Sequence, residues 1–183
     1  MGYAGMLRPM DGCRKVILIG FMASGKSSVV SYLAPKLGWD VCHLDDDIVS
    51  RSGLPSVAAI FKEHGEAYFR DLEAEAAHAR KDAQRVVIAT GGGVITRSSN
   101  IEHLKYNGGV VVYLKTSFET ITERVGDIST RPLFADKASA LDLYVKRLPV
   151  YESYADIIVD TDERTTDEVS EEIFNQLKST ICS

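Results

Sequence analysis

KVILIGFMASGKSS, residues 15–28, decides how the rest of this chain is arranged. Four apolar residues, 16–19, run into Gly20, and residues 20–27 fit the pattern G-x-x-x-x-G-K-[ST]. Its two glycines let successive backbone N–H groups point at phosphate oxygens. The helix that follows presents its own unpaired N–H groups to the same anion. The stretch therefore predicts a phosphate-binding loop (P-loop) rather than a plain glycine turn.

Two side chains of this P-loop have predicted roles. Lys26 can reach the β- and γ-phosphates of a nucleotide, and the Ser27 hydroxyl can bind Mg²⁺. Nucleotide contacts are expected along the whole turn and the first helical residues: Met22, Ala23, Ser24, Gly25, Lys26, Ser27 and Ser28.

Length and composition indicate one globular domain. The chain has 183 residues, of which 45% are hydrophobic and 26% charged, which is the globular range and argues against a disordered chain. A net charge of −5 argues against a general nucleic-acid binder. The three scattered cysteines favour a reducing compartment. No segment has transmembrane or signal-peptide character. We expect a cytoplasmic protein with a loose leader over residues 1–13 and a single domain over residues 14–183.

Strand and helix signals alternate along the chain, which predicts an α/β fold with a parallel sheet covered on both faces. Strands are expected at residues 16–19, 40–44, 86–89, 110–114 and 157–159. Helices are expected from the P-loop to residue 37, at 56–80 with a break at Gly65, at 118–125, at 141–151 and from a capping box at Thr165 to residue 177. Ligands bind such sheets at the carboxyl ends of the strands. The special residues follow the first three strands and should line one crevice.

An acidic cluster, Asp45-Asp46-Asp47, follows the second strand. If the strand continues, Asp45 shares a face with Val41 and His43. A carboxylate there can hold Mg²⁺ through water or accept the proton of a hydroxyl nucleophile. The alternative is a solvated helix start, where Asp is favoured. We favour a functional role for Asp45, and for the other two both interpretations stay open.

Three glycines, Gly91, Gly92 and Gly93, follow the third strand. They indicate either a main chain that a substrate approaches closely or a simple tight turn. On this stretch alone, both interpretations stay open.

Arginines occur where an anionic substrate would need them. A planar guanidinium binds carboxylate or phosphate with two hydrogen bonds, although Arg70, Arg131 and Arg147, taken singly, are each ordinary surface charges. A segment over residues 126–140 that carries Arg131 would close over a nucleotide as a lid.

The order of these segments resembles shikimate kinase over nearly the whole chain, about residues 16–177. The shared features are GxxxxGKS, an Asp ending the second strand, GEAYFRDLE at 65–73, ATGGGV at 89–94, TRPLF at 130–134 and KRLPVYESYAD at 146–156. P-loops occur in many enzymes, but this combination is much more specific. The resemblance implies a three-layer P-loop kinase fold, with a five-stranded parallel sheet in the order 2-3-1-4-5, helices on both faces and a short lid.

The resemblance also implies an activity. Shikimate kinases phosphorylate the 3-hydroxyl of shikimate with ATP, giving shikimate 3-phosphate and ADP on the way to chorismate and the aromatic amino acids. The implied cofactors are ATP and Mg²⁺, and the implied partner is a small molecule, with no nucleic acid and no membrane. We expect a monomer.

Matching positions imply the substrate contacts. Arg70 and Arg147 would grip the carboxylate of shikimate, and Glu73 would buttress Arg70. Asp45 would bind the ring hydroxyls and orient or deprotonate the nucleophile. The implied substrate-binding residues are Asp45, Arg70, Gly91, Gly92, Gly93 and Arg147.

The remaining matches concern the nucleotide and the transferred group. Arg131 would neutralise the phosphoryl group from the lid, so that Lys26, Asp45 and Arg131 are the implied catalytic residues. Arg124 would lie against the adenine, and Arg164 would touch the nucleotide. Ser27 is the implied metal ligand.

One position departs from the family pattern. The family shows Asp-x-Asp at the end of the second strand, with the first Asp assisting Mg²⁺, but this chain has His43-Leu44-Asp45. A neutral imidazole is a poor ligand for Mg²⁺, which prefers oxygen. Either Ser27, phosphates and water hold the ion, or the register slips and Asp45-x-Asp47 takes the role. The choice between Asp45 and Asp47 as the substrate carboxylate stays open.

Other functions are consistent with parts of the sequence. A P-loop kinase for another hydroxy acid, such as gluconate, shares the loop, but the triple glycine and the R-x-P-x-Y stretch argue against it. A catalytically weak, nucleotide-binding regulatory protein derived from a kinase is favoured only by His43. A nucleoside monophosphate kinase is disfavoured because the chain has no long insert for a base.

Overall fold

The computed structural model describes residues 12–125 and 136–181. Its centre is one five-stranded sheet with the strand order β2-β3-β1-β4-β5. Every neighbouring pair of strands is parallel. The strands are β1 (Lys15–Ile19), β2 (Asp40–His43), β3 (Val86–Ala89), β4 (Gly109–Lys115) and β5 (Ile157–Asp160). The number, direction and order of the strands confirm the sequence-based prediction.

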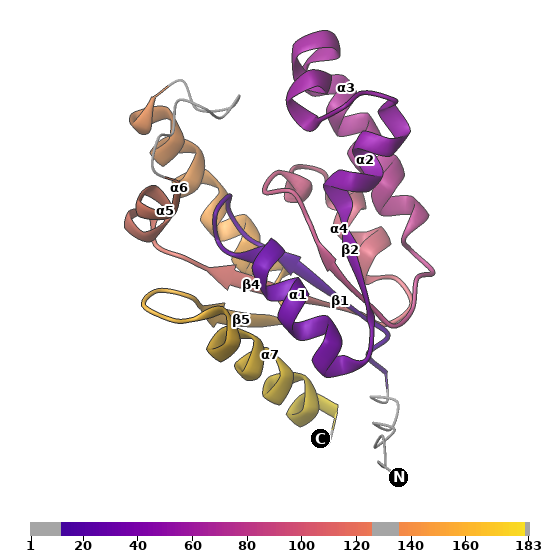
Figure 1. Ribbon diagram of the computed structural model, residues 1–183, viewed down its shortest axis with the longest axis vertical. Coiled ribbons are helices and arrows are strands. Elements are labelled where there is room, and N and C mark those ends of the chain that lie inside the picture. Colours follow the sequence, from indigo (N-terminus) through magenta and orange to yellow (C-terminus); the bar gives the residue numbers. More distant parts are fainter. Residues whose placement is uncertain (1–11, 126–135, 182–183) are drawn as a thin grey trace.

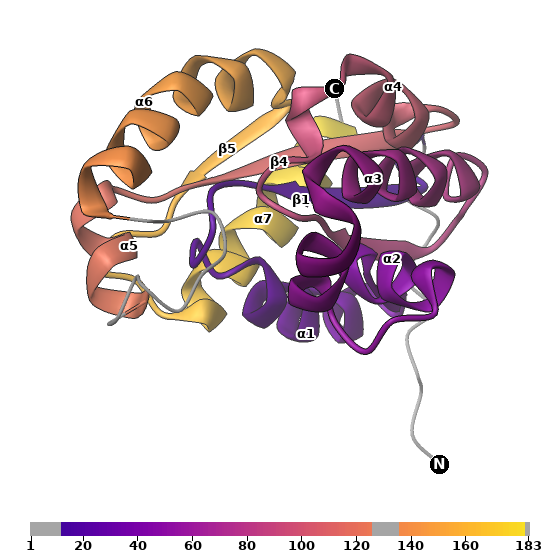
Figure 2. The same ribbon diagram turned by 90° about the horizontal axis from the view of Figure 1, so that it is seen from above.

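Helices cover both faces of this sheet, as Figures 1 and 2 show. One face packs against α1 (Lys26–Leu37) and α7 (Thr166–Ile181), and the other against α3 (Val57–Ala79), α4 (Ser98–Lys105) and α6 (Lys137–Tyr154). Shorter elements complete the fold: α2 (Leu44–Ser52), η1 (Val94–Thr96) and α5 (Phe118–Val125). In β1, Val16 and Leu18 face one apolar core while Ile17 and Ile19 face the other, so the strand is buried on both sides.

Local signals at the helix ends act as predicted. Helix α1 ends at Gly38, whose φ of 66° lies in the left-handed region. The Ser56 hydroxyl accepts a hydrogen bond at the start of α3, and Gly65 (φ 80°, ψ 179°) interrupts that helix. At α7, the Thr165 backbone N–H donates to Glu168 Oε2 at 2.8 Å, which confirms the capping box.

The predicted second strand was one residue too long, and its predicted strand face for Asp45 was wrong. Strand β2 ends at His43, and Asp45 lies in the first turn of α2. Leu44 and Ile48, four residues apart, are both fully buried, so the helical apolar face begins at Leu44. Three carboxylates in that first turn also suit the positive end of the helix dipole.

Other boundaries differ less. The short helix α4 was not predicted, although Ile101 and Leu104 bury its inner face. Helix α6 begins earlier and ends later than expected and continues past Pro149. Of the expected lid, residues 126–135 lie outside the described part, and Asp136 caps the N-terminus of α6. Among residues 12–125 and 136–181, no helix has the length and apolar character needed to cross a membrane.

Candidate active site

A cavity of about 940 Å³ opens at the carboxyl ends of β1 and β3. This volume lies near the upper end of the ~300–1,000 Å³ range of ligand pockets and leaves room for two ligands. All the predicted site residues in the described ranges line it: Met22, Ala23, Ser24, Gly25, Lys26, Ser27, Ser28, Asp45, Arg70, Gly91, Gly92, Gly93, Arg124, Arg147 and Arg164. Arg131 lies outside the described residues, so its place on a lid stays a prediction.

The P-loop has the predicted curled backbone. Gly20 and Gly25 adopt φ values of 149° and 96°, and Ala23 also lies in the left-handed region at 55°. At Gly20 a Cβ would lie 2.8 Å from the Leu114 carbonyl oxygen, so glycine is also required for space. The loop folds around the Lys26 ammonium group.

The Lys26 side chain is buried under the loop. Its Nζ donates to the carbonyl oxygens of Gly20 and Phe21, each at 2.7 Å, and to Ser24 Oγ at 3.2 Å. Burial lowers the pKa of Lys26 from 10.5 to about 8, against the opposing attraction of Asp45. Lys26 is therefore a desolvated cation that gains from the approach of an anion.

Asp45 and Glu73 point toward Gly91 from two helices. A Cβ at Gly91 would lie 3.1 Å from Asp45 Oδ1 and 3.2 Å from Glu73 Oε1. Although Asp45 is open to the cavity, the surrounding protein raises its pKa by desolvation, and the charge of Lys26 lowers it in part. A carboxylate with a raised pKa that faces a cavity is suited to accept a proton from a substrate hydroxyl.

Asp47 has a different environment. Its two oxygens accept hydrogen bonds from Arg80 Nε at 2.6 Å and Nη2 at 2.7 Å. This bidentate ion pair ties α2 to the C-terminal end of α3, and neither residue is among those that line the cavity. His43 is not among the lining residues either.

Arg70 is fixed in place by two carboxylates on its own helix. Its Nη1 donates to the fully buried Glu73 Oε2 at 2.8 Å, and its Nη2 donates to Glu66 Oε1 at 3.1 Å. The position of a Cβ at Gly93 lies only 2.3 Å from Arg70 Nη2. At Gly93, the group that approaches the main chain closely is therefore the arginine, and any side chain there would displace it.

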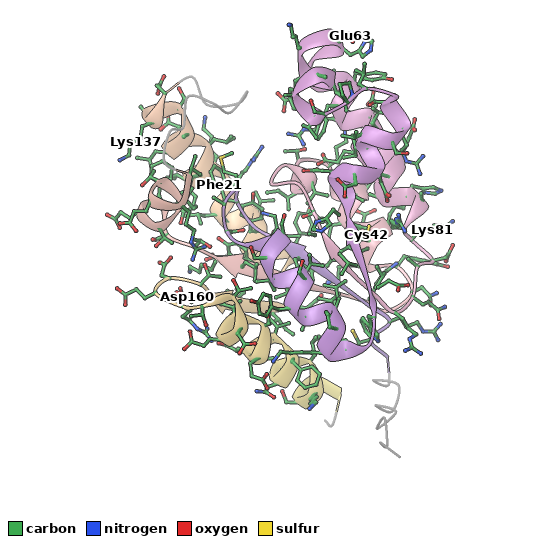
Figure 3. All side chains as sticks on the ribbon, viewed as in Figure 1. Phe21, Cys42, Glu63, Lys81, Lys137 and Asp160 are labelled. Atoms are coloured by element: carbon green, nitrogen blue, oxygen red, sulfur yellow. The ribbon has the colours of Figure 1, made fainter. Side chains whose placement is uncertain are left out.

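Arg147 reaches the same cavity from α6. Its guanidinium carbon lies 5.9 Å from the centre of the Phe21 ring, which Figure 3 labels, and its Nη1 lies 3.7 Å from the Cβ position of Gly92. Its Nε is buried and has no hydrogen-bond partner among the described residues. The buried Arg147 Nε beside the glycine triplet is suited to donate to an anionic ligand.

The P-loop end of the cavity is completed by residues from two further segments. Arg124 donates to the carbonyl oxygens of Ala23 at 3.3 Å and Thr161 at 3.0 Å, so it bridges the P-loop and the end of β5. Arg164 lines the cavity, but its guanidinium also binds Glu172 Oε2 at 2.5 Å. Arg124 is therefore held against the P-loop, whereas an ion pair with Glu172 holds Arg164.

Sequence reasoning missed several lining residues. The aromatic and aliphatic residues among them lie in the P-loop, on α1 or on α3: Phe21, Tyr32, Val57, Phe61 and Phe69. The threonines follow β3, follow β5 or lie at the start of α7: Thr90, Thr161, Thr165 and Thr166. For Thr90 and Thr161 the position directly after a strand was an available signal, since ligands bind there, whereas tertiary packing brings the residues of α1, α3 and α7 to the cavity. Arg97, which donates to the Arg70 carbonyl oxygen at 3.1 Å, gave no signal because that contact joins distant segments.

Comparison with known proteins agrees with this geometry. The sequence model described as "SKI: Shikimate kinase" matches residues 22–178. The chain belongs to the shikimate kinase family. It is therefore a kinase, in a family that uses ATP. Shikimate kinase from Thermodesulfovibrio yellowstonii is 39% identical over 166 residues, covering 89% of this chain and 94% of that protein. Shikimate kinase from Moorella thermoacetica is 38% identical over 165 residues, covering 90% and 94%.

Solved structures give the same family. Shikimate kinase from Acinetobacter baumannii in complex with shikimate has a TM-score of 0.85 and 30% identity, and covers 92% of this chain and 94% of that one. Shikimate kinase from Aquifex aeolicus has a TM-score of 0.77, 33% identity and coverage of 92% and 99%. A gluconokinase from Sinorhizobium meliloti reaches only 0.60 at 18% identity, with coverage of 93% and 94%, which shows a shared fold alone.

Proposed function

We propose that this shikimate kinase family member transfers the γ-phosphoryl group of ATP to the 3-hydroxyl of shikimate. One observation carries the proposal: a single cavity joins a P-loop with a desolvated lysine to two arginines and a carboxylate suited to a hydroxy acid. Phosphoryl transfer needs positioning and charge neutralisation more than covalent chemistry, and these residues supply both.

Each residue has a distinct role in this proposal. Arg70 and Arg147 bind the substrate carboxylate and fix the ring. Asp45 accepts the proton of the 3-hydroxyl, which then attacks the γ-phosphorus while ADP leaves. Lys26 exchanges its bonds to the loop carbonyls for phosphate oxygens, and its charge offsets the negative charge of the transferred group. The family resemblance assigns Arg131, which lies outside the described residues, the role of a second cation at the transferred group.

The P-loop also fits a Mg²⁺ ion. In the described part of the chain, no group of three or more His, Cys, Asp and Glu side chains is arranged to hold a metal. On the P-loop, the Ser27 hydroxyl is exposed to the cavity, so Ser27, ATP phosphates and water would hold the ion. Asp47 is paired with Arg80, which argues against the alternative in which the register slips. When bound, Mg²⁺ supplies positive charge to the phosphate oxygens.

We further infer a cytoplasmic monomer. One chain supplies the P-loop, Asp45 and both arginines to the same cavity, so a second copy is not needed to complete the described part of the site. Cys13 and Cys42 are buried free thiols, as suits a reducing compartment.

A coupled ADP-release assay with ATP and Mg²⁺ tests the proposed function. We expect release to depend strongly on shikimate and to remain near background with gluconate or quinate. ADP release with gluconate but not with shikimate would show that the chain phosphorylates a different acceptor. ATP binding without release for any of these acids would favour a nucleotide-binding regulatory protein.

The pKa of Lys26 predicts how ATP affinity depends on pH. Above pH 8 the lysine of the free protein is increasingly neutral, so ATP binding must take up a proton. The affinity should then fall by up to about tenfold per pH unit between pH 8 and 9.5. Calorimetry with ATP in EDTA, which removes any metal contribution, measures both affinity and proton uptake. Lys26→Met should bind weakly at every pH, and a wild-type affinity that stays constant to pH 9.5 would contradict the prediction.

A further inference from the structure

Tyr151 connects the core of the protein to the glycine triplet. It lies on α6 and is fully buried, and its ring stacks on Tyr113 of β4 with centroids 5.1 Å apart and planes 17° apart. Its hydroxyl donates to the Gly92 carbonyl oxygen at 2.5 Å. Burial raises the pKa of Tyr151 to about 12, so the hydroxyl keeps its proton at neutral pH and remains a donor.

Gly92 is the point where the two halves of the cavity meet. The Cβ position at Gly92 lies 3.4 Å from the Met22 backbone nitrogen in the P-loop and 3.7 Å from Arg147 Nη1. The next residue, Gly93, packs directly against the Arg70 guanidinium. A shift of the Gly92 main chain would therefore change the spacing between the two arginines and the P-loop.

A second tyrosine of α6 provides a natural comparison. Tyr144 lies two turns before Tyr151, and its hydroxyl also donates to a main-chain carbonyl, that of Thr116, at 2.8 Å. Thr116 follows β4 and is not among the residues that line the cavity. Helix α6 is thus attached by two tyrosine hydroxyls, with Arg147 between them, and only the Tyr151 hydroxyl reaches the glycine triplet.

We propose that Tyr151 is a positioning residue for the acceptor site. Its hydroxyl fixes the Gly92 carbonyl and so sets the distance between Arg147, one turn earlier on the same helix, and the Gly93 position that seats Arg70. Tyr151 itself touches no reacting atom, and it acts through its bond to the triplet and through its side-chain contact with Arg147. This inference rests on the proposed function, because the two arginines are its assumed carboxylate clamp.

Tyr151→Phe tests the proposal, because it keeps the stacked ring and removes only the hydroxyl. We expect the KM for shikimate to rise roughly tenfold, since small misplacements of binding groups have large effects, while the KM for ATP changes less than about twofold. Tyr144→Phe, which removes the matching hydroxyl from the other attachment, should leave both KM values unchanged. Thermal melts of the two variants show whether stability differs between them.

Several outcomes would overturn the proposal. These are a Tyr151→Phe variant with wild-type KM values, one whose two KM values rise equally, or one that no longer folds, which would make the hydroxyl a stability element. If the wild type shows no shikimate-dependent release, the proposed function fails instead. In that case, amide hydrogen exchange at Gly91, Gly92 and Gly93 still tests whether Tyr151 positions the triplet. Tyr151→Phe should accelerate this exchange, and Tyr144→Phe should not.

Discussion

Asp45→Asn is expected to lower kcat by about 10²–10⁴-fold while ATP affinity stays within about a factor of two. Asparagine has the same shape and can still accept a hydrogen bond from a hydroxyl, but it cannot take up the proton. Asp45 faces the cavity beside Gly91, 3.1 Å from its Cβ position, and burial raises its pKa, which suits it to accept a proton. ADP release at saturating shikimate gives kcat, and calorimetry gives the ATP affinity.

Asp47→Asn is the matched control. Asp47 is bound to Arg80 through both oxygens, so this variant should lose a few degrees of Tm and keep nearly all of its turnover. The two variants make the same chemical change two residues apart in α2. Near-normal turnover in Asp45→Asn, with a collapse of turnover in Asp47→Asn, would transfer the proton-accepting role to Asp47.

Gly93→Ala is expected to raise the KM for shikimate roughly 100-fold without changing the KM for ATP. The new Cβ would lie 2.3 Å from Arg70 Nη2, which neither group can tolerate. Arg70 cannot move away without breaking its bonds to Glu73 and Glu66. A displaced Arg70 would lose its two proposed hydrogen bonds to the shikimate carboxylate. Each such charge-assisted bond is worth about 1.5–3 kcal/mol, which accounts for an effect of this size.

A double-mutant cycle isolates the cause of this effect. In an Arg70→Met background, Gly93→Ala should add little, because the guanidinium that it displaces is already gone. Steady-state KM values for the four proteins give the coupling between the two positions. Simple additivity would show that Gly93 acts through the main chain and not through Arg70.

The sequence predicted elements best where one strong local signal decided them. Strand β3 and helix α5 have the predicted bounds, because a short apolar run or a clear helical period marks each. Strand β1 begins at Lys15, one residue before its predicted start. The charge of Lys15 argues for exposure, yet its side chain is fully buried. Its Nζ donates to the Arg80 carbonyl oxygen at 2.9 Å and to that of Lys81. Partners more than sixty residues away are not visible in a local pattern.

The sequence predicted which residues line the cavity but not which hydrogen bonds hold them in place. The P-loop pattern and the glycine triplet located the cavity, because strand ends meet at one edge of a parallel sheet. The sequence left a strand end and a helix start open for Asp45, because both are compatible with a short acidic run, and the structure shows the helix start. The pairing of Asp47 with Arg80 and the hydroxyl bond of Tyr151 to Gly92 depend on tertiary packing, which spacing alone does not encode.

The cavity described above has a consequence for how ligands arrive. The chain as a whole carries a net charge of −5, yet the described lining of this cavity holds five side-chain cations against three carboxylates: Lys26, Arg70, Arg124, Arg147 and Arg164 against Asp45, Glu73 and Asp167. Low-dielectric walls concentrate the field of such charges at the mouth of a cleft. Nucleotides and hydroxy acids, both anions, are then drawn toward the cleft and repelled from the acidic remainder of the surface. Their capture from dilute solution becomes faster than random collision, and added salt weakens this advantage.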